Sequence, residues 1–315
     1  MGDTDAEIKE MLLACEHRTG AMTLEQKIPF TKMHGLGNCY IYLDGVTRKL
    51  SIPSFPELSK QVSDPYKGIG SDGLILILPS EQADVKMRIF NKDGSEAMNC
   101  GNGLRCVAKY AYEHQLVDSD TFFIETLSGN KQARVHVIDG NVEQVTVDMG
   151  EPILERGKIP VSGGNAEESV IREKLTVDDV DYSFTAVSMG NPHALFFVDE
   201  VDQAPIHRLG ALLADTHPLF PNGVNVGFVQ KRSDSEVNYR VWERGSGITQ
   251  ACGTGACASV VASILEERIT RDVPVTVHLE GGDLTIEWRS DTNHVMMTGE
   301  AKTICEGVFF TNECL

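Results

Sequence analysis

Cys100-Gly101-Asn102-Gly103 and Cys252-Gly253-Thr254-Gly255 are two copies of one short pattern, Cys-Gly-x-Gly, placed 152 residues apart. In both copies the spacing of the apolar residues changes after the cysteine. From there on, apolar residues recur three and four positions apart, as on one face of a helix. The first series is Leu104, Val107, Ala108 and Ala111, and the second is Cys257, Val260, Val261 and Ile264. Each cysteine therefore directly precedes a glycine-rich turn that opens an apolar helix.

The repetition extends outward from the two cysteine motifs. Further matches keep the order and nearly the same offset: Arg88-Ile89-Phe90 with Arg240-Val241-Trp242, Gly37-Asn38 with Gly190-Asn191, and Gly70-x-Asp72 with Gly223-x-Asn225. Matches that recur in order at a near-constant offset indicate an internal duplication. We expect an N-terminal half over residues 28–150, with residues 303–315 as a candidate addition to it, and a C-terminal half over residues 151–302. Residues 1–27 form an extension outside the repeat, and we assign it no role.

The residues around each predicted helix have mostly the pattern of strands. Val85, Met87 and Ile89 alternate with polar residues, which is typical of a half-buried strand. Asp139-Gly140 is a tight-turn dipeptide between two strand-like segments, so it predicts a hairpin. An antiparallel sheet wrapped around its own apolar helix buries both elements. We therefore predict an α+β fold of two pseudo-symmetric domains, each a mostly antiparallel sheet or barrel around a central helix.

The composition excludes several classes of partner. The 315 residues carry a formal net charge of −18, whereas nucleic acids and anionic membrane surfaces need a basic footprint. No apolar run approaches the roughly 18 residues that span a bilayer. None of the eight cysteines lies in a Cys-x-x-Cys pair, so the spacing of a zinc or thioredoxin-type site is missing. We expect a cytoplasmic protein with reduced thiols, no metal, no nucleic-acid partner and no membrane partner.

The position of Cys100 and Cys252 at a helix start gives them chemistry. The first N–H groups of a helix are unpaired and carry the positive end of the helix dipole, so the thiolate is favoured there and the pKa of the thiol is expected to fall. The glycines also let a ligand carboxylate approach the backbone amides. If the duplication brings both helix starts to one cleft between the halves, a thiol stands on each side of one anion.

Two opposed thiols suit inversion at a carbon next to a carboxylate. One thiolate removes the α-proton from one face, the opposite thiol delivers a proton to the other face, and the helix-end amides stabilise the carbanion in a dry site. No lysine motif for pyridoxal phosphate is evident, so we expect no cofactor. Two plainer interpretations stay open: buried structural cysteines at two helix starts, or a disulfide between Cys100 and Cys252, which a reducing cytosol disfavours.

From about Phe30 to Ala301 the chain resembles the diaminopimelate epimerase family. Four stretches carry the resemblance: FTKMHGLGN at 30–38, NKDGSEAMNCGNGLRC at 91–106, the loops GNPH at 190–193 and GVNV at 223–226, and ERGSGITQACGTGAC at 243–257. Together these motifs are far more specific than the Cys-Gly-x-Gly pattern alone. The resemblance implies the fold predicted above, a small amino-acid substrate and a homodimer.

The resemblance also implies a role for each matching residue. Cys100 and Cys252 match the acid–base pair. The cradle for the reacting carboxylate matches the amides of Gly101, Asn102, Gly253 and Thr254, with Asn38 nearby. The groups that hold the distal, non-reacting end match Asn91, Asn191, Asn225 and Arg244. Glu243 and His193 match two polar residues close to the thiols. The chemistry agrees, because an arginine fork binds a carboxylate and amide or carboxylate oxygens accept from an ammonium.

These residues also have plainer interpretations, and the chain departs from the family in places. Loop asparagines are usually turn formers, His193 is a candidate loop histidine, and Arg244 beside Glu243 is a candidate surface pair. Cys39-Tyr40 stands where the family more often has Asp-Phe. Gly73 stands where some members carry a glutamine that contacts the reacting carboxylate. The glycine removes one side-chain contact and leaves the two-thiol mechanism in place.

The first prediction is therefore an isomerase that interconverts LL- and meso-2,6-diaminopimelate in lysine biosynthesis. The nearest rival is another two-thiol racemase on the same fold, acting on histidine or a proline-like substrate. Arg244 with three asparagines favours a substrate that has a second charged end. A rival of another class is a redox-sensing binding protein that switches by disulfide formation, and exchange of the substrate α-proton with solvent would separate it from an enzyme.

Overall fold

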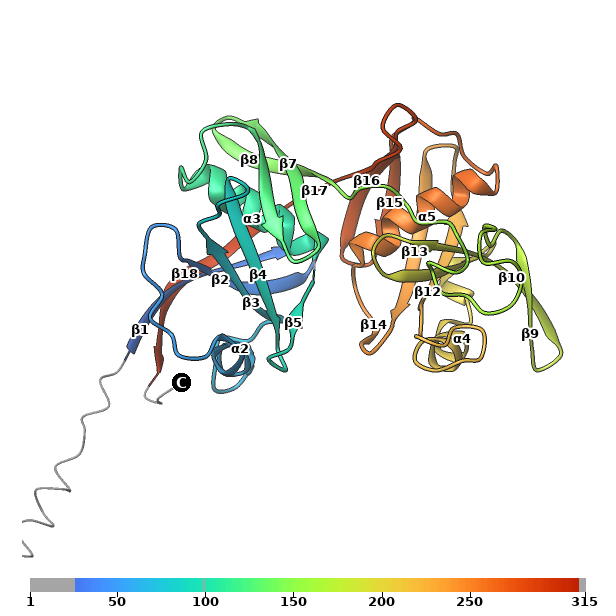
Figure 1. Cartoon of the computed structure of the whole chain (residues 1–315), viewed down its shortest axis with the longest axis horizontal. Coiled ribbons are helices and arrows are strands. Elements are labelled where there is room, and N and C mark those ends of the chain that lie inside the picture. Colours follow the sequence, from blue (N-terminus) through green and yellow to red (C-terminus); the bar gives the residue numbers. More distant parts are fainter. Residues whose placement is uncertain (1–25, 99, 312–315) are drawn as a thin grey trace, which may run out of the picture.

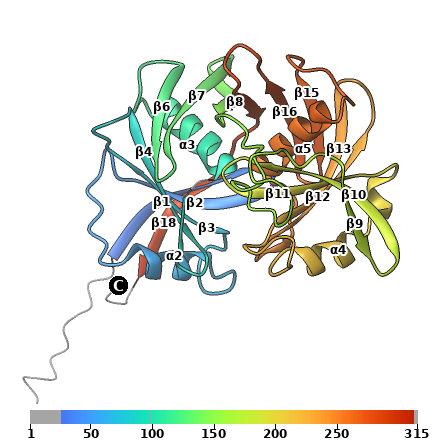
Figure 2. The ribbon, with the colours of Figure 1, turned by 45° about the vertical axis from the view of Figure 1, so that its right-hand side comes forward.

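The computed structural model describes residues 26–98 and 100–311, so most of the predicted N-terminal extension lies outside the described residues. Figure 1 shows two lobes side by side. Each lobe holds one long helix, α3 (Gly101–Glu113) in the first and α5 (Gly253–Leu265) in the second, with strands around it (Figure 2). The predicted α+β architecture, a mostly antiparallel sheet around a central helix in each half, is confirmed.

The first lobe combines strands from both ends of the described chain. Its strands are β1 (Gln26–Gly35), β2 (Asn38–Asp44), β3 (Gly73–Leu78), β4 (Val85–Asn91), β5 (Glu96–Ala97), β6 (Thr121–Thr126), β7 (Gly129–Ile138), β8 (Asn141–Asp148) and β18 (Lys302–Thr311). β18 pairs with β1 in antiparallel register. Helix α2 (Phe55–Ser63) begins at Ser54, whose hydroxyl accepts from the Glu57 N–H, and it packs on β3 and β4.

The second lobe is built on the same plan. Its strands are β9 (Glu173–Val177), β10 (Val180–Ser188), β11 (Pro192–Phe197), β12 (Asn225–Lys231), β13 (Glu236–Glu243), β14 (Gly247–Ile248), β15 (Val275–Leu279), β16 (Gly282–Trp288) and β17 (Val295–Gly299). The short 3₁₀ helix η1 (Val201–Gln203) precedes α4 (Ile206–Leu213), which packs on β12 and β13 as α2 packs on β3 and β4. The two covering helices therefore occupy equivalent places.

The two lobes share one order of strand pairing, which is the structural counterpart of the sequence repeat. In the first lobe β1–β2 is antiparallel, β2–β3 parallel, β3–β4 antiparallel and β4–β6 parallel, and β6–β7–β8 follow antiparallel. In the second lobe β10–β11, β11–β12, β12–β13, β13–β15 and β15–β16–β17 repeat these senses in the same order. β8 pairs with β17, so one sheet continues from lobe to lobe.

Local structure follows the sequence signals at the turns and helix starts. Asp139 and Gly140 both have positive φ in the turn between β7 and β8, as a tight Asp-Gly hairpin turn requires. Cys100 and Cys252 are the N-cap residues of α3 and α5. The predicted single apolar stripe is incomplete for α3, because strands and the neighbouring lobe enclose its first two turns and bury even the polar Asn102 and Arg105.

Candidate active site

Cys100 is the N-cap of α3, and its thiol takes part in the capping. The sulfur accepts a hydrogen bond from the Gly103 N–H at 3.3 Å and donates to Asn38 Oδ1 at 3.6 Å. Its extended backbone, with φ of −150° and ψ of 108°, is the conformation expected just before a helix. The thiol is therefore held against the open end of the helix, as the sequence pattern predicts.

Cys252 is the N-cap of α5 and has different partners. Its side chain forms no capping hydrogen bond, and its sulfur lies 3.5 Å from Thr254 Oγ1. The residue is buried, with 5% of its surface exposed. The two cysteines thus occupy the same backbone position in their lobes, but only the first uses its sulfur as a cap.

The two helix starts meet at the side chain of Met297 on β17. A Cβ atom placed on Gly101 would lie 2.8 Å from Met297 Cε, and one on Gly253 would lie 3.0 Å from Met297 Sδ. The Gly253 position also lies 3.7 Å from Asn102 Oδ1. The structure therefore brings together the residues that follow each cysteine, and glycine at both positions lets the backbones approach so closely.

An amide network surrounds Cys100. Asn38 Nδ2 donates to Asp72 Oδ2 at 2.8 Å, which fixes the amide so that its Oδ1 faces the Cys100 thiol and also accepts from Asn102 Nδ2 at 3.3 Å. Asn91 is less central, because its side chain bonds Ser95 Oγ at 3.0 Å in the turn after β4. Asn38 and Asn102 therefore lie in the thiol environment, whereas Asn91 stands at the strand end and stabilises a turn.

His193 connects the second cysteine motif to the loop before β11. Its Nε2 lies 3.1 Å from both Asn191 Oδ1 and Thr254 Oγ1. Burial and the nearby Arg244 lower the pKa of His193 to about 3, so its imidazole is neutral at physiological pH. Its Nδ1 is buried without a hydrogen-bond partner among the described residues. His193 therefore lies in strand β11, with one ring nitrogen hydrogen-bonded to the second cysteine motif.

Asn225, Arg244 and Glu243 lie together on β12 and at the end of β13. Asn225 Oδ1 accepts from the Arg244 N–H at 2.9 Å, and its Nδ2 donates to the Pro192 carbonyl at 3.1 Å. The Arg244 guanidinium donates to the Asn222 carbonyl, and no carboxylate of the described residues forms an ion pair with it. Glu243 accepts from the Thr249 hydroxyl. In this structure Asn225 ties two loops together, while the arginine has no anionic partner in the described part of the chain.

The two thiols differ in their electrostatic surroundings. Burial raises the pKa of Cys100, while the Gly103 N–H and the Arg105 guanidinium oppose the rise. Burial and the Glu243 carboxylate together raise the pKa of Cys252 well above its usual range. The predicted lowering of the pKa values is therefore wrong for this structure, because loss of solvent outweighs the helix end. The two thiols still differ in the charge beside them, because the Arg105 cation acts on Cys100 and the Glu243 carboxylate acts on Cys252.

Tyr40 is a neighbour of Cys100 that sequence reasoning noticed only as a departure from the family. It is buried, and its hydroxyl hydrogen-bonds the Cys100 thiol. A Cβ atom at Gly73 would lie 3.0 Å from the Tyr40 ring and 2.1 Å from the Phe90 carbonyl oxygen. The glutamine that some family members carry therefore does not fit at position 73, and the tyrosine ring covers this glycine.

A turn of the first lobe inserts into the second lobe close to the Cys252 segment. Leu36 has a φ of 56° and a buried side chain. Its carbonyl lies 2.3 Å from the position of a Cβ on Gly281, and Gln250 Oε1 lies 2.6 Å from that of a Cβ on Gly37. A side chain at Gly281 would clash with the Leu36 backbone and push the lobes apart, whereas one at Gly37 would displace the Gln250 side chain. This contact has no signature in the sequence repeat, so sequence analysis missed it.

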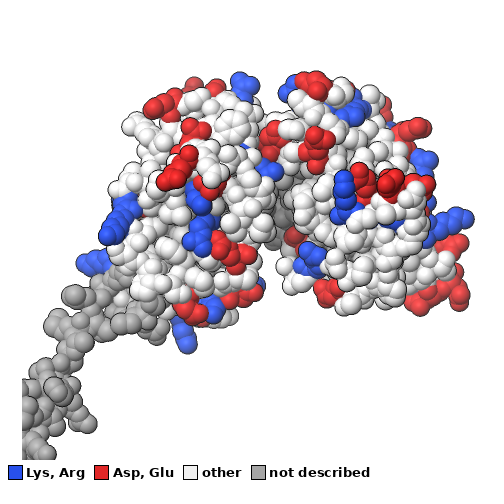
Figure 3. Space-filling view, viewed as in Figure 1, with Lys and Arg blue, Asp and Glu red and all other residues white. Residues whose placement is uncertain are grey.

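Other features bear on the alternatives. Cys100 and Cys252 are free thiols here, so the structure contains no disulfide between them. Among residues 26–98 and 100–311, no group of three or more histidine, cysteine and acidic side chains could hold a metal ion. Over the same residues, no helix combines the length and apolarity needed to cross a membrane. Figure 3 shows the surface hollowed between the two lobes, with acidic and basic side chains near the rim.

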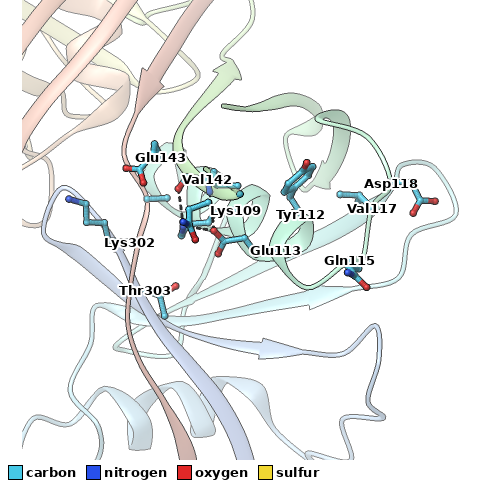
Figure 4. A pocket seen from close by; sticks show the side chains of 13 residues that line it. Lys109, Tyr112, Glu113, Gln115, Val117, Asp118, Val142, Glu143, Lys302 and Thr303 are labelled. Atoms are coloured by element: carbon cyan, nitrogen blue, oxygen red, sulfur yellow. Dashed lines mark hydrogen bonds and ion pairs between the residues drawn. The ribbon is translucent and has the colours of Figure 1, made fainter. Parts of the chain in front are cut away.

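A surface depression of about 1100 Å³ lies elsewhere on the first lobe, at the C-terminal end of α3, the turn before β8 and the start of β18 (Figure 4). Lys109 crosses its floor, bonding Glu113 at 2.6 Å and the Val142 carbonyl at 2.8 Å. The lining includes none of the residues predicted for the site. The depression is therefore separate from the two helix starts.

Comparison with known proteins identifies the relatives of this chain. The family model described as diaminopimelate epimerase matches residues 30–155 and 185–304. A diaminopimelate epimerase of Geobacillus kaustophilus is 58% identical over 281 residues, covering 89% of this chain and 96% of that protein. One of Bacillus subtilis is 57% identical over 281 residues, covering 89% and 98%.

Solved structures with low sequence identity share the fold. A PhzF-family phenazine biosynthesis protein of Bacillus anthracis superposes with a TM-score of 0.65 at 17% identity, over 90% of this chain and 99% of that one. A hydroxyproline epimerase of Agrobacterium vitis superposes with a TM-score of 0.62 at 16% identity, over 91% and 92%. At such identities the likeness concerns the fold alone.

Proposed function

Because this chain belongs to the diaminopimelate epimerase family and is an isomerase of the epimerase class, we propose that it interconverts LL- and meso-2,6-diaminopimelate by a two-thiol proton transfer, in lysine biosynthesis. One observation carries the mechanism. Cys100 and Cys252 are free thiols at the N-caps of two helices, and the starts of these helices meet at Met297. A structural role alone would not require close approach of both helix starts.

In the proposed step the Cys100 thiolate takes the α-proton, so the C–H bond breaks and an S–H bond forms. The resulting carbanion receives the Cys252 proton on its opposite face, which leaves a thiolate on Cys252. The backbone amides at Gly101 and Asn102, and at Gly253 and Thr254, hold the reacting carboxylate and stabilise its charge, because unpaired helix-start N–H groups bind anions strongly in a dry site. No pyridoxal phosphate or metal takes part in this step.

The distal end of the substrate would bind at the loops of the second lobe. Arg244 supplies a fork for the distal carboxylate, and it has no competing carboxylate in the described residues. The distal ammonium would bind to acceptors from the set Asn91, Asn191, Asn225 and Glu243, while neutral His193 holds Thr254 and Asn191 in place. A substrate with only one charged end would leave the guanidinium unpaired.

We assign residues 28–150 with 303–311 to one domain and 151–302 to the other, and their closure would exclude water from the carbanion. The last residues of the candidate addition 303–315, from 312 on, lie outside the described residues. The protein would act in the cytoplasm as a homodimer. The dimer proposal is supported by β18, which pairs only with β1 among the described strands and exposes Ile304, Val308 and Phe310. An unpaired strand edge with exposed apolar side chains favours association. Sedimentation velocity would test it, and a monomer at micromolar concentration would exclude it.

The decisive experiment measures exchange of the substrate α-proton. The protein is incubated with diaminopimelate, histidine or proline in deuterated water, and the α-proton signal is followed by NMR. We expect loss of the signal with diaminopimelate only, and no epimerisation by Cys100→Ala or Cys252→Ala. Cys305→Ala, which removes an exposed thiol on β18, is the matched control and should be fully active. Exchange with proline or histidine instead of diaminopimelate would show that the substrate assignment is wrong. Full turnover by either active-site variant would refute the two-thiol mechanism.

A further inference from the structure

Arg105 is a fully buried cation next to the site, and the proposed mechanism does not use it. It lies on α3 shortly after Cys100, with 0% of its surface exposed. Its guanidinium donates to the Glu300 carbonyl at 3.1 Å, to Asn102 Oδ1 at 3.0 Å and to Met297 Sδ at 3.7 Å. All three acceptors are neutral. No carboxylate in the described part of the chain forms an ion pair with Arg105.

The backbone of both lobes leaves room for this guanidinium. A Cβ atom on Gly35 of β1 would lie 2.9 Å from Arg105 Nη2, and one on Gly299 of β17 would lie 3.2 Å from its Nε. Through Met297 and the Glu300 carbonyl, the side chain also joins α3 to the connection between β17 and β18. Arg105 is thus a built-in feature of the junction at which the helix starts meet.

A buried guanidinium without an anion is energetically costly, so its retention points to a negative charge that forms nearby. The ionisable groups that act on it are Cys106, Cys100, Cys257 and Tyr42, all neutral in their ordinary state. Of these, Cys100 has its sulfur at an open helix end, where the Gly103 N–H and the Tyr40 hydroxyl can both bind a thiolate. Hydrogen bonds also connect Cys100 to Arg105: Arg105 Nη2 donates to Asn102 Oδ1, and both Asn102 Nδ2 and the Cys100 thiol donate to Asn38 Oδ1. Cys100 is therefore the group at which an anion that balances Arg105 would form.

We propose that Arg105 is a positioning residue that supplies the buried positive charge for the Cys100 thiolate and so leaves the resting proton on Cys252. The catalytic meaning of this assignment rests on the proposed function. The titratable groups around the two sulfurs fit it. Those facing Cys100 are Tyr40 and Tyr42 from β2 with Arg105 and Cys106 from α3, and the Asn38 amide separates the Asp72 carboxylate from this thiol. Cys252 faces Glu243 and Tyr239 from β13. The cation thus faces one thiol and the carboxylate faces the other.

The test is the rate at which iodoacetamide alkylates each cysteine of the full chain between pH 5 and pH 10, resolved by peptide mass spectrometry without substrate. We expect Cys100 to react before Cys252 at pH 7. Arg105→Met should slow Cys100 alkylation about tenfold at pH 7, because loss of the cation would raise the pKa of the Cys100 thiol by about one unit. Arg105→Lys should retain most of the rate. Arg88→Met is the matched control, because it removes an arginine on β4 that pairs with Glu96. It should change the alkylation rate of neither Cys100 nor Cys252.

In turnover, Arg105→Met should lower kcat and move the pH optimum upward with little change in KM, since Arg105 does not touch the substrate. Reaction of Cys252 before Cys100 in the unmodified protein would overturn the proposal, and so would equal Cys100 rates in folded Arg105→Met and the parent chain. If circular dichroism shows that Arg105→Met is unfolded, the order of alkylation in the parent and in Arg105→Lys decides. Alkylation needs no substrate, so absence of epimerase activity with the expected alkylation pattern would refute the proposed function alone.

Discussion

The two lobes place equivalent rows of residues beside their cysteines, and the rows differ in charge. In the first lobe the row crosses β2, β3 and β4 and consists of Tyr40, Gly73 and Asn91. In the second lobe it crosses β11, β12 and β13 and consists of His193, Asn225 and Glu243. The strand pairing is the same in sense, order and register, so the rows occupy the same places in each sheet, although in the sequence repeat Asn225 matches Asp72, the residue before Gly73. The duplication has kept the backbone arrangement while the side chains have diverged.

The difference matters because inversion needs one base and one acid at the outset. Identical surroundings would give two thiols of equal acidity. The first row carries no charge, whereas Glu243 in the second row raises the pKa of Cys252, and Arg105 acts against the rise at Cys100. The symmetric fold thus brings the two helix starts together at Met297, and the asymmetric rows place different charges beside the two thiols.

The largest effect is expected from Glu243→Gln, which removes the charge from the second row and so tests whether that charge makes the two thiols differ. Without the carboxylate the Cys252 thiol ionises more readily, so its alkylation should begin at lower pH than in the parent chain. Turnover should fall about a hundredfold, because the acid that reprotonates the carbanion loses its proton and positioned acid–base groups contribute at least that much. Alkylation profiles and the rate of deuterium incorporation at pH 7 measure the two effects.

Glu236→Gln is the matched control for this change, since Glu236 lies at the far end of the same strand and is exposed. It should leave both the alkylation of Cys252 and turnover as they were. If Glu243→Gln left the alkylation profile of Cys252 where it was, the carboxylate would not be the cause of the inequality between the thiols.

The second prediction compares the glycines two residues after the first glycine of each motif. A Cβ atom on Gly255 would lie 2.3 Å from the Tyr239 hydroxyl oxygen and 2.9 Å from its ring. One on Gly103 would lie 2.7 Å from the Ile75 Cδ1 methyl and at ordinary contact distance, 3.5 Å or more, from Cys100. Both neighbours are buried, but Tyr239 presents a rigid ring, whereas the Ile75 methyl is the end of a flexible side chain. We expect Gly255→Ala to lower the free energy of unfolding by about 2–3 kcal/mol and Gly103→Ala by about 1 kcal/mol. Urea denaturation followed by circular dichroism measures both, and equal losses would show that the two helix starts are packed alike.

The sequence repeat predicted the parts of this site that depend on the local chain. The Cys-Gly-x-Gly copies marked both helix starts, and the change of period after Cys100 and Cys252 located them correctly, because an N-cap and a glycine-rich turn leave a pattern in consecutive residues. The Asp139-Gly140 turn was predictable for the same reason. Membership of the family was also evident from the motifs.

The features that join the lobes had no such pattern. Met297 is one apolar residue in an alternating strand, and Leu36 lies in an ordinary turn, so nothing local shows that they meet residues far away in the sequence. Arg105 falls where an isolated amphipathic helix would expose it, and its burial follows only from the elements packed around α3. The direction of the thiol pKa shifts was mispredicted for the same reason, since a helix end is visible in the sequence and the loss of solvent is not.

The smallest expected effect concerns the Tyr40 hydroxyl in the first row. Tyr40→Phe keeps the ring over Gly73 and removes only the hydroxyl beside Cys100, so the fold and the melting temperature should hold. A hydrogen bond of this kind is worth about 1 kcal/mol, so the thiolate should be harder to form and Cys100 alkylation at pH 7 should slow about fivefold. Tyr66→Phe, at a residue 95% exposed, is the control and should have no effect. If Tyr40→Phe reacted as fast as the parent chain, the hydroxyl would serve packing alone, and Arg105 with the helix end would account for the whole stabilisation of the thiolate.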